Sequence, residues 1–213
     1  MNDYATRAGT PAASTGQVVR RRLVDLATGA LGAAIVIALL VGAEWAVEIA
    51  DYILPENLDQ YGIRPHDVNG LSGILFAPFL HAGFGHLMAN TVPLAILGFL
   101  AALRGLGRFT LASLIIIVVS GAGVWLISPP GITLGASGLV FGYFGYVVTR
   151  GLFDRHPLDI ALGVGVAVLY YSLIEGVLPG QPGISWQAHL FGLVGGVIAA
   201  WTLRRRKRAV TPG

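Results

Sequence analysis

The sequence predicts an all-α membrane protein with six transmembrane helices, and three observations support this prediction. Of the 213 residues, 54% are hydrophobic and only 12% are charged, whereas ordinary soluble domains carry about 25% charged residues. The mean hydropathy is +0.71. Apolar runs with few or no charges recur along the chain, and about 20 such residues suffice for a helix that crosses a bilayer. A water-soluble fold is not expected.

The first predicted span begins near Leu26, and no charged residue occurs as far as Ala43. A cleaved signal peptide is the alternative interpretation, but the run is long, and Glu44 and Glu48 crowd any cleavage site. The other spans are predicted at residues 84–103, 109–127, 137–149, 158–178 and 186–203.

Two segments rich in proline and glycine separate the predicted helices. Ser128-Pro129-Pro130-Gly131 divides one long uncharged stretch into two antiparallel spans, because these residues stop a helix. The segment 54–77 also contains prolines and glycines, and it predicts a first outer loop associated with the membrane. Its backbone must lie outside the bilayer core or be buried in protein.

The basic residues predict the orientation of the chain. Of the 14 lysines and arginines, all but Arg64 fall on one side of the predicted layout. They are Arg7, Arg20, Arg21, Arg22, Arg104, Arg108, Arg150, Arg155, Arg204, Arg205, Arg206, Lys207 and Arg208. Basic residues mark cytoplasmic segments, so we expect both termini in the cytoplasm.

This layout divides the chain into a flexible N-terminal tail (1–25), a membrane domain (26–203) and a basic C-terminal tail (204–213). The net charge of +3 comes from short clusters between apolar runs, which indicates membrane orientation and not nucleic-acid binding. The chain has no cysteine, which excludes disulfides and thiolate metal sites.

The second, fourth and sixth spans all enter from the outer face, and each begins with polar residues. These are His86 with Asn90, then Ser137, then His189. His86 and Asn90 are four residues apart and share one helical face, whereas His81 is rotated from His86 by ~140° and belongs to the preceding loop. The sequence therefore places these polar groups at one membrane depth.

Small residues surround two of these polar positions. Gly135 and Gly138 flank the position of Ser137, and Gly192 lies one turn after His189. Such small residues allow helix backbones to approach closely. Proton transfer from a serine to a histidine needs about 2.6–3.2 Å between heavy atoms, which close approach makes reachable.

Each feature alone has an ordinary structural explanation. A serine in a membrane helix commonly bonds its own backbone, glycine seams pack helices together, and a histidine can simply bond a neighbour. The combination favours function, because ionisable groups inside a membrane are costly.

Three segments at these helix starts follow a known pattern. They are His81-Ala-Gly-Phe-Gly-His86-Leu-Met-Ala-Asn90, Gly135-Ala-Ser137-Gly138 and Ala188-His189-Leu-Phe-Gly192. In order and in placement on the spans they resemble the signatures of the rhomboid intramembrane proteases, over about residues 76–201. The three-part combination is far more specific than a single GxSG match.

The resemblance implies a role for each residue. Ser137 is expected to be the nucleophile, His189 the general base, and His86 and Asn90 donors to the oxyanion, while His81 braces the first outer loop. Because no acidic residue is evident near His189 on these spans, a serine–histidine dyad is expected, with Glu175 as the exception left open.

Gly135, Gly138 and Phe141 occupy supporting positions in the same pattern. Many rhomboid proteases carry a tyrosine at the position of Phe141 that packs on the catalytic histidine, so phenylalanine keeps the stacking and loses the hydroxyl. The outer loop reads Gly62-Ile-Arg64-Pro65 and lacks the tryptophan–arginine pair seen in some members.

The expected function is therefore that of a serine endopeptidase that cleaves transmembrane protein substrates within the lipid bilayer, without a cofactor or metal. The alternative is a catalytically inactive rhomboid-like binder or chaperone. A transporter would need charges at mid-depth, and a metalloprotease would need an HExxH motif, which is absent. A prokaryotic plasma membrane is the expected location, and the oligomeric state stays open.

Overall fold

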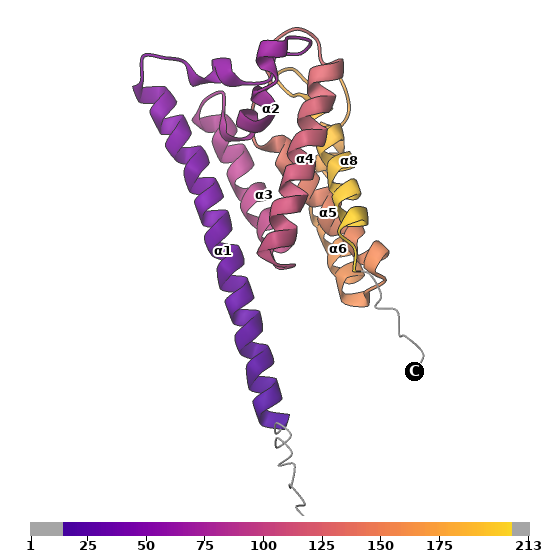
Figure 1. Ribbon diagram of the computed structural model, residues 1–213. Helices are drawn as coiled ribbons and strands as arrows, with labels where there is room; N and C mark the ends of the chain where they lie inside the picture. Colours follow the sequence, from indigo (N-terminus) through magenta and orange to yellow (C-terminus); the bar gives the residue numbers. More distant parts are fainter. Residues whose placement is uncertain (1–14, 206–213) are drawn as a thin grey trace, which may run out of the picture.

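Six helices of 13 residues or more form a bundle in the computed structural model, which describes residues 15–205 (Figure 1). They are α1 (Thr15–Ile53), α3 (Phe84–Ala102), α4 (Leu106–Ile127), α5 (Ser137–Asp154), α6 (Pro157–Leu169) and α8 (Trp186–Thr202). The short elements are η1 (Leu58–Tyr61), η2 (Val68–Gly70), α2 (Gly73–Phe76), η3 (Ala77–Phe79) and α7 (Leu173–Gly176). The predicted all-α class is confirmed.

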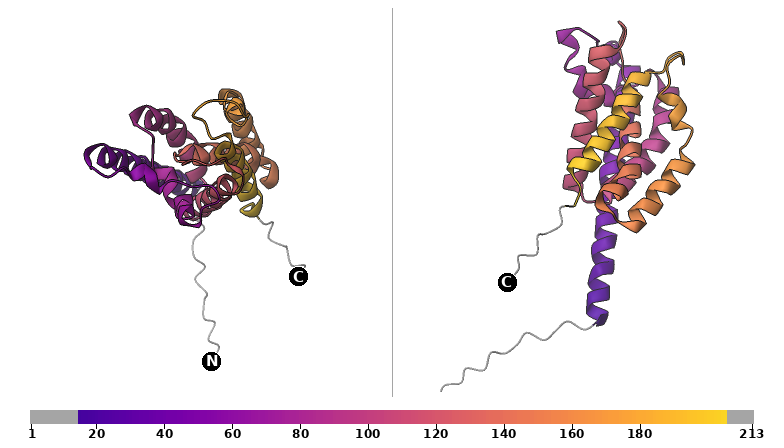
Figure 2. Two further views of the ribbon diagram at one scale, coloured as in Figure 1. Left: turned by 90° about the horizontal axis from the view of Figure 1, so that it is seen from above. Right: turned by 90° about the vertical axis from the view of Figure 1, so that its right-hand side faces the viewer.

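Helix α5 is the centre of the bundle. Every residue from Gly138 to Val147 is buried, as expected of a helix that is apolar on all sides. It packs against α3, α4, α6 and α8, and Figure 2 shows these helices around it from two further directions. The core therefore encloses the helix that begins with Ser137.

Helices α1, α3 and α4 are long and apolar enough to cross a membrane by themselves. Helices α5 and α8 have 18 and 17 residues, and α6 has 13. Helix α5 packs against α3 and α4, α8 packs against α4 and α5, and α6 packs against α5. The shorter helices therefore belong to the same bundle.

The predicted boundaries need two corrections. Helix α1 begins at Thr15, so residues 15–25 belong to a helix and not to a tail. Residues 17–28 contain neither glycine nor proline, so nothing stops the helix there. Helix α1 has 39 residues, or about 58 Å at 1.5 Å per residue, and its N-terminal part projects beyond the other helices (Figure 1). The remaining tail residues, 1–14 and 206–213, lie outside the described part.

The second correction concerns the fifth span, predicted at 158–178. Helix α6 ends at Leu169, where Tyr170 leaves helical geometry with φ −110° and ψ 25°. The separate turn α7 follows at Leu173–Gly176. The break redirects the chain, so that Gly176 can contact α8.

The first outer loop is held by the connection between α4 and α5. Ile63 and Thr133 form an isolated antiparallel bridge. The backbone N–H of His66 donates to the carbonyl of Trp125 at 3.1 Å, and the indole Nε1–H of Trp125 donates to the carbonyl of Asp67 at 2.9 Å. Much of the loop backbone is therefore satisfied by protein, as a loop beside a bilayer requires.

Two acidic side chains of α1 are buried in the bundle. Glu44 is 0% exposed and Glu48 is 4% exposed. Neither carboxylate oxygen of Glu44 has a hydrogen-bond partner among the described residues. Beside them, the indole Nε1–H of Trp45 donates to the hydroxyl of Thr91 on α3 at 3.1 Å. Both carboxyl groups are therefore enclosed by the fold.

Charged side chains join the helices at the opposite end. Arg104, after α3, pairs with Asp154 of α5 and with Asp159 of α6, the latter at 2.6 Å. Arg150 of α5 lies 3.5 Å from Asp159. These partly buried pairs connect the ends of three helices.

Candidate active site

Ser137 is the first residue of α5, and a tight turn places it there. Gly135 has φ +115°, a conformation that residues other than glycine rarely adopt. Its N–H donates to the carbonyl of Ala77 at 2.8 Å, which ties the turn to the outer loop. Ser137 is half-buried at the end of this turn.

His81 holds the same turn from the loop side. The N–H of Ala136 donates to Nε2 of His81 at 3.3 Å. Burial, together with the neighbouring His86, lowers the pKa of His81 to about 4. The ring is therefore neutral at neutral pH, as an accepting Nε2 requires. The hydrogen bond of His81 therefore goes to the residue that precedes Ser137, and the bracing of the outer loop by His81 stays a prediction.

His189 lies in the first turns of α8, which begins after Ser185. The hydroxyl of Ser185 accepts the N–H of Ala188 at 3.3 Å and caps the helix. The ring of His189 stacks on Phe141, with ring centroids 4.0 Å apart and planes inclined by 11°. The stacking expected at Phe141 is therefore present in the structure.

The second contact of the His189 ring is a hydrogen bond. Nδ1 lies 2.8 Å from the carbonyl oxygen of Gly176. A carbonyl oxygen only accepts, so Nδ1 carries the proton in this bond, and the neutral ring keeps a lone pair on Nε2. The buried ring is ready to accept a proton at Nε2.

Helices α5 and α8 touch through glycine directly beside both residues. A Cβ atom on Gly192 would lie 2.3 Å from the carbonyl oxygen of Gly138, and one on Gly196 would lie 2.0 Å from that of Gly142. Gly138 follows Ser137, and Gly192 is one turn after His189. The backbone contact therefore brings the hydroxyl-bearing and imidazole-bearing turns to the same end of two adjacent helices.

His86 and Asn90 differ in their surroundings. A Cβ atom on Gly135 would lie 2.6 Å from Cε1 and 2.8 Å from Nε2 of His86, so this ring lies against the turn that precedes Ser137. The amide Nδ2 of Asn90 donates to the carbonyl of His86 within its own helix at 3.1 Å. The His86 ring therefore contacts the turn, and the hydrogen bond of Asn90 joins it to His86 within α3.

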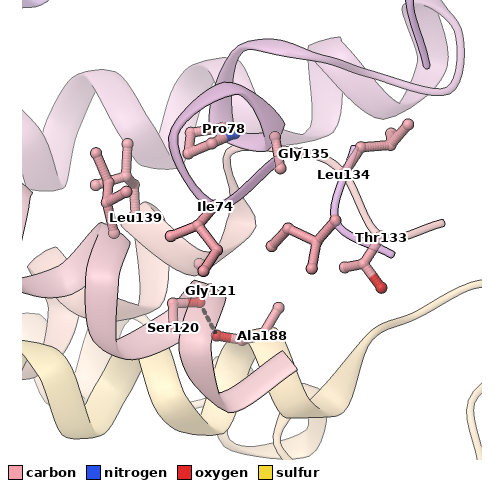
Figure 3. Close-up of a pocket in the computed structure, with 13 residues that line it drawn as sticks. Ile74, Pro78, Ser120, Gly121, Thr133, Leu134, Gly135, Leu139 and Ala188 are labelled. Atoms are coloured by element: carbon pink, nitrogen blue, oxygen red, sulfur yellow. Dashed lines mark hydrogen bonds between the residues drawn. The ribbon is translucent and has the colours of Figure 1, made fainter. Parts of the chain in front are cut away.

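A small cavity lies beside this turn (Figure 3). Its volume is about 30 Å³, enough to hold a water molecule. Gly135, Leu139 and Ser120 lie around it, and the hydroxyl of Ser120 donates to the carbonyl of Ala188 at 2.9 Å. Ser120 is not among the polar residues predicted for the site. Its position as a polar residue within an uncharged span is the feature that could have indicated it.

Among residues 15–205, no group of three or more histidine, cysteine or acidic side chains could hold a metal ion. The structure has a serine at the start of α5, an oriented imidazole near the start of the adjacent α8, and a histidine of α3 against the turn that precedes the serine.

These features define a class: an α-helical integral membrane protein with a serine and a histidine at the same end of two tightly packed helices. Residues 68–206 match the Rhomboid domain, and the chain belongs to the rhomboid family. Most of the membrane bundle, including all the site residues described above, lies within this match.

Several bacterial proteins are similar to this chain. The uncharacterized protein Rv1337 of Mycobacterium tuberculosis is 44% identical over 181 residues, which cover 81% of this chain and 75% of that protein. The uncharacterized protein ML1171 of Mycobacterium leprae is 41% identical over 77% of this chain and 68% of its own length. YdcA of Bacillus subtilis, provisionally named a rhomboid protease, is 31% identical over 65% of this chain and 71% of its length.

Proposed function

We propose that this protein is an intramembrane serine endopeptidase in which Ser137 is the nucleophile and His189 the general base. The main observation behind the proposal is the glycine contact between α5 and α8, because it places both side chains at one end of adjacent helices. The hydrogen bond from Nδ1 to Gly176 also leaves Nε2 available as a base. The family membership and the name of the Bacillus relative agree with this activity.

In the proposed reaction, Nε2 of His189 takes the hydroxyl proton as Oγ of Ser137 attacks the carbonyl carbon of the scissile peptide bond. The imidazolium then gives this proton to the leaving amine, and an acyl-enzyme remains. Water attacks the ester, His189 again accepting a proton and returning it to Oγ. The carboxylic acid product leaves and releases its proton to water, and both residues are restored.

The negative charge on the substrate oxygen needs hydrogen-bond donors. Ser137 begins α5, so the free N–H groups of the first turn and the positive end of the helix dipole lie at the reacting atoms. His86 of α3 supplies a side-chain donor against the turn before Ser137, and Asn90 has a second amide hydrogen. Donors held in place before reaction are the effective ones.

No carboxylate completes a triad in this proposal. The partner of Nδ1 of His189 is a backbone carbonyl, and Glu175, the exception left open, contributes its own backbone carbonyl to Gln181 at 3.2 Å. The side chain of Glu175 is exposed. A serine–histidine dyad oriented by the backbone therefore fits the site.

The substrates we propose are transmembrane segments of other membrane proteins. A helix hides its peptide carbonyls in hydrogen bonds, so cleavage requires a segment that unwinds near the site, and helix-destabilising residues favour this. The mycobacterial and Bacillus relatives support a bacterial plasma membrane as the location.

Covalent labelling tests the proposal. We expect the detergent-solubilised protein to react with a fluorophosphonate probe and to lose the reaction in Ser137→Ala and His189→Ala. Ser72→Ala removes an exposed hydroxyl that makes no capping bond, and it should label like the wild type. An unlabelled, folded wild type would instead favour the catalytically inactive binder or chaperone.

A further inference from the structure

We propose that Gly176 is a positioning residue: its carbonyl holds His189 in the Nδ1–H tautomer, and its missing side chain leaves room for the stacked ring. The proposal rests on the proposed protease function of Ser137 and His189. It assigns a part in that function to α7, a turn outside the three sequence signatures.

The break after α6 makes this contact possible. A helix continuing from α6 would run on past Tyr170, but the chain turns there and forms α7. The carbonyl of Glu175 accepts from Gln181 at 3.2 Å, and that of Ile174 accepts the N–H of Val177 at 3.3 Å. The carbonyl of Gly176 is directed to His189 at 2.8 Å.

Two contacts together define the orientation of the imidazole. The stacking on Phe141 sets the plane of the ring. The bond to Gly176 sets the rotation of the ring within that plane, because only Nδ1 meets the carbonyl. With Nδ1 fixed in this way, Nε2 occupies the opposite edge of the ring. A 180° flip of the ring would put Cδ2 in the place of Nδ1 and lose this hydrogen bond.

The bond also matters when the ring takes up a proton. In the neutral ring Nδ1–H donates to the carbonyl, and in the imidazolium the same N–H still donates. The negative end of the carbonyl dipole therefore faces the positive charge that forms during attack. In serine–histidine–aspartate sites a carboxylate orients the base and stabilises its cation, and here a backbone group takes that position.

Position 176 has no space for a side chain. A Cβ atom there would lie 2.7 Å from Cζ of Phe141 and 3.0 Å from Nδ1 of His189. The backbone of Gly176 does not have a positive φ, so alanine can adopt its conformation. The methyl group of Gly176→Ala therefore displaces one or both of the stacked rings of Phe141 and His189.

Gly165 of α6 is the matched control. A Cβ atom there meets no atom within 4 Å, and φ is not positive. Gly165→Ala makes the same chemical change in the preceding helix without touching either ring. We expect it to behave like the wild type in every measurement.

The first test is nitrogen-15 NMR of the histidine rings in the detergent-solubilised wild type, with His189→Ala to assign the signal. We expect His189 in the neutral state to show a protonated Nδ1 and an unprotonated Nε2. This readout needs no activity. A ring with its proton on Nε2, or with rapid exchange between tautomers, would overturn the proposal even if the protease function stands.

The second test compares Gly176→Ala with Gly165→Ala on a fluorogenic transmembrane peptide. A displacement of the base by about 1 Å costs on the order of 100-fold in rate, so we expect kcat to fall to that extent. KM should stay within about two-fold, since Gly176 acts through His189 and not on substrate. Folding of each variant is checked by circular dichroism and size-exclusion chromatography.

The outcomes separate the two proposals. A folded Gly176→Ala variant with the kcat of Gly165→Ala contradicts the positioning role. A wild type that neither labels nor cleaves contradicts the protease function, and the NMR result still decides the tautomer. If Gly176→Ala fails to fold, the tautomer in the wild type is the deciding measurement.

Discussion

His86 and Asn90 occupy one face of α3, one turn apart, yet their side chains make different contacts. The ring of His86 lies against Gly135 in the turn before Ser137, whereas the Asn90 amide bonds the carbonyl of His86. Helical periodicity predicts the shared face. It does not predict what each side chain contacts, because those contacts depend on how α3 packs against α5.

This difference leads to a prediction at the residue scale. Loss of one oxyanion donor costs about 100-fold or more in kcat, and we expect His86→Ala to lose that much. Asn90→Ala should lose less, about 10-fold, because its amide already bonds the helix backbone. Single-turnover cleavage of a fluorogenic transmembrane peptide measures both. Met88→Ala, at an exposed position on the same helix, serves as the control. A larger loss of kcat in Asn90→Ala than in His86→Ala would contradict His86 as the stronger oxyanion donor.

At the scale of elements, the pairing of α5 with α8 depends on glycines, which have no side chain. Gly192 and Gly196 face carbonyl oxygens of α5 at distances that exclude a side chain. Backbone atoms cannot move aside as a flexible side chain can, so a methyl group at either position forces the helices apart. The same contact determines the separation of Ser137 and His189.

We therefore expect Gly192→Ala to lower both thermal stability and activity. Overpacking of this kind lowers the free energy of unfolding by about 1–3 kcal/mol. The unfolding temperature in detergent measures the loss of stability, and the cleavage assay measures the loss of activity. Gly107→Ala in the first turn of α4 is the control, because its Cβ would meet no atom within 4 Å and φ at Gly107 is not positive. Equal unfolding temperatures for the two variants would refute this account of the interface.

Helix α1 shows where local sequence signals are insufficient. Its apolar run predicts a span, and the structure confirms a long apolar helix there. The run does not predict how the acidic residues beside it are placed, and Glu44 is fully buried without a hydrogen-bond partner among the described residues. An isolated buried carboxylate is costly, and only the packing of α1 on the bundle reveals this burial.

At the scale of the whole molecule, the distribution of arginines supports the orientation that we propose, with both termini in the cytoplasm. Arg104 and Arg150 also form ion pairs that join α3, α5 and α6 at that end. The turn bearing Ser137 lies at the opposite end of α5. In this orientation the site is near the outer surface, where water can reach it.

Cysteine labelling tests the orientation cleanly, because the chain contains no cysteine. Glu56 is exposed in the first outer loop, and Arg205 is exposed after α8. We expect a membrane-impermeant maleimide to label Glu56→Cys in intact cells and to label Arg205→Cys only after the membrane is opened. The reverse pattern would place the site on the cytoplasmic side.

The sequence by itself determined the helical class, the order of the spans and the position of Ser137, His86 and His189 near helix starts. These follow from the lengths of apolar runs and from local proline and glycine, which act within a few residues. The comparison with the Rhomboid domain agrees with that layout.

Only the tertiary structure decided how the parts meet. The break at Tyr170 carries Gly176 to His189, and Nε2 of His81 meets Ala136 across 55 positions of sequence. The closeness of α5 and α8 follows from glycines that face one another from separate helices. Each of these contacts joins segments far apart in the chain, and their geometry arises from packing, which local periodicity does not encode.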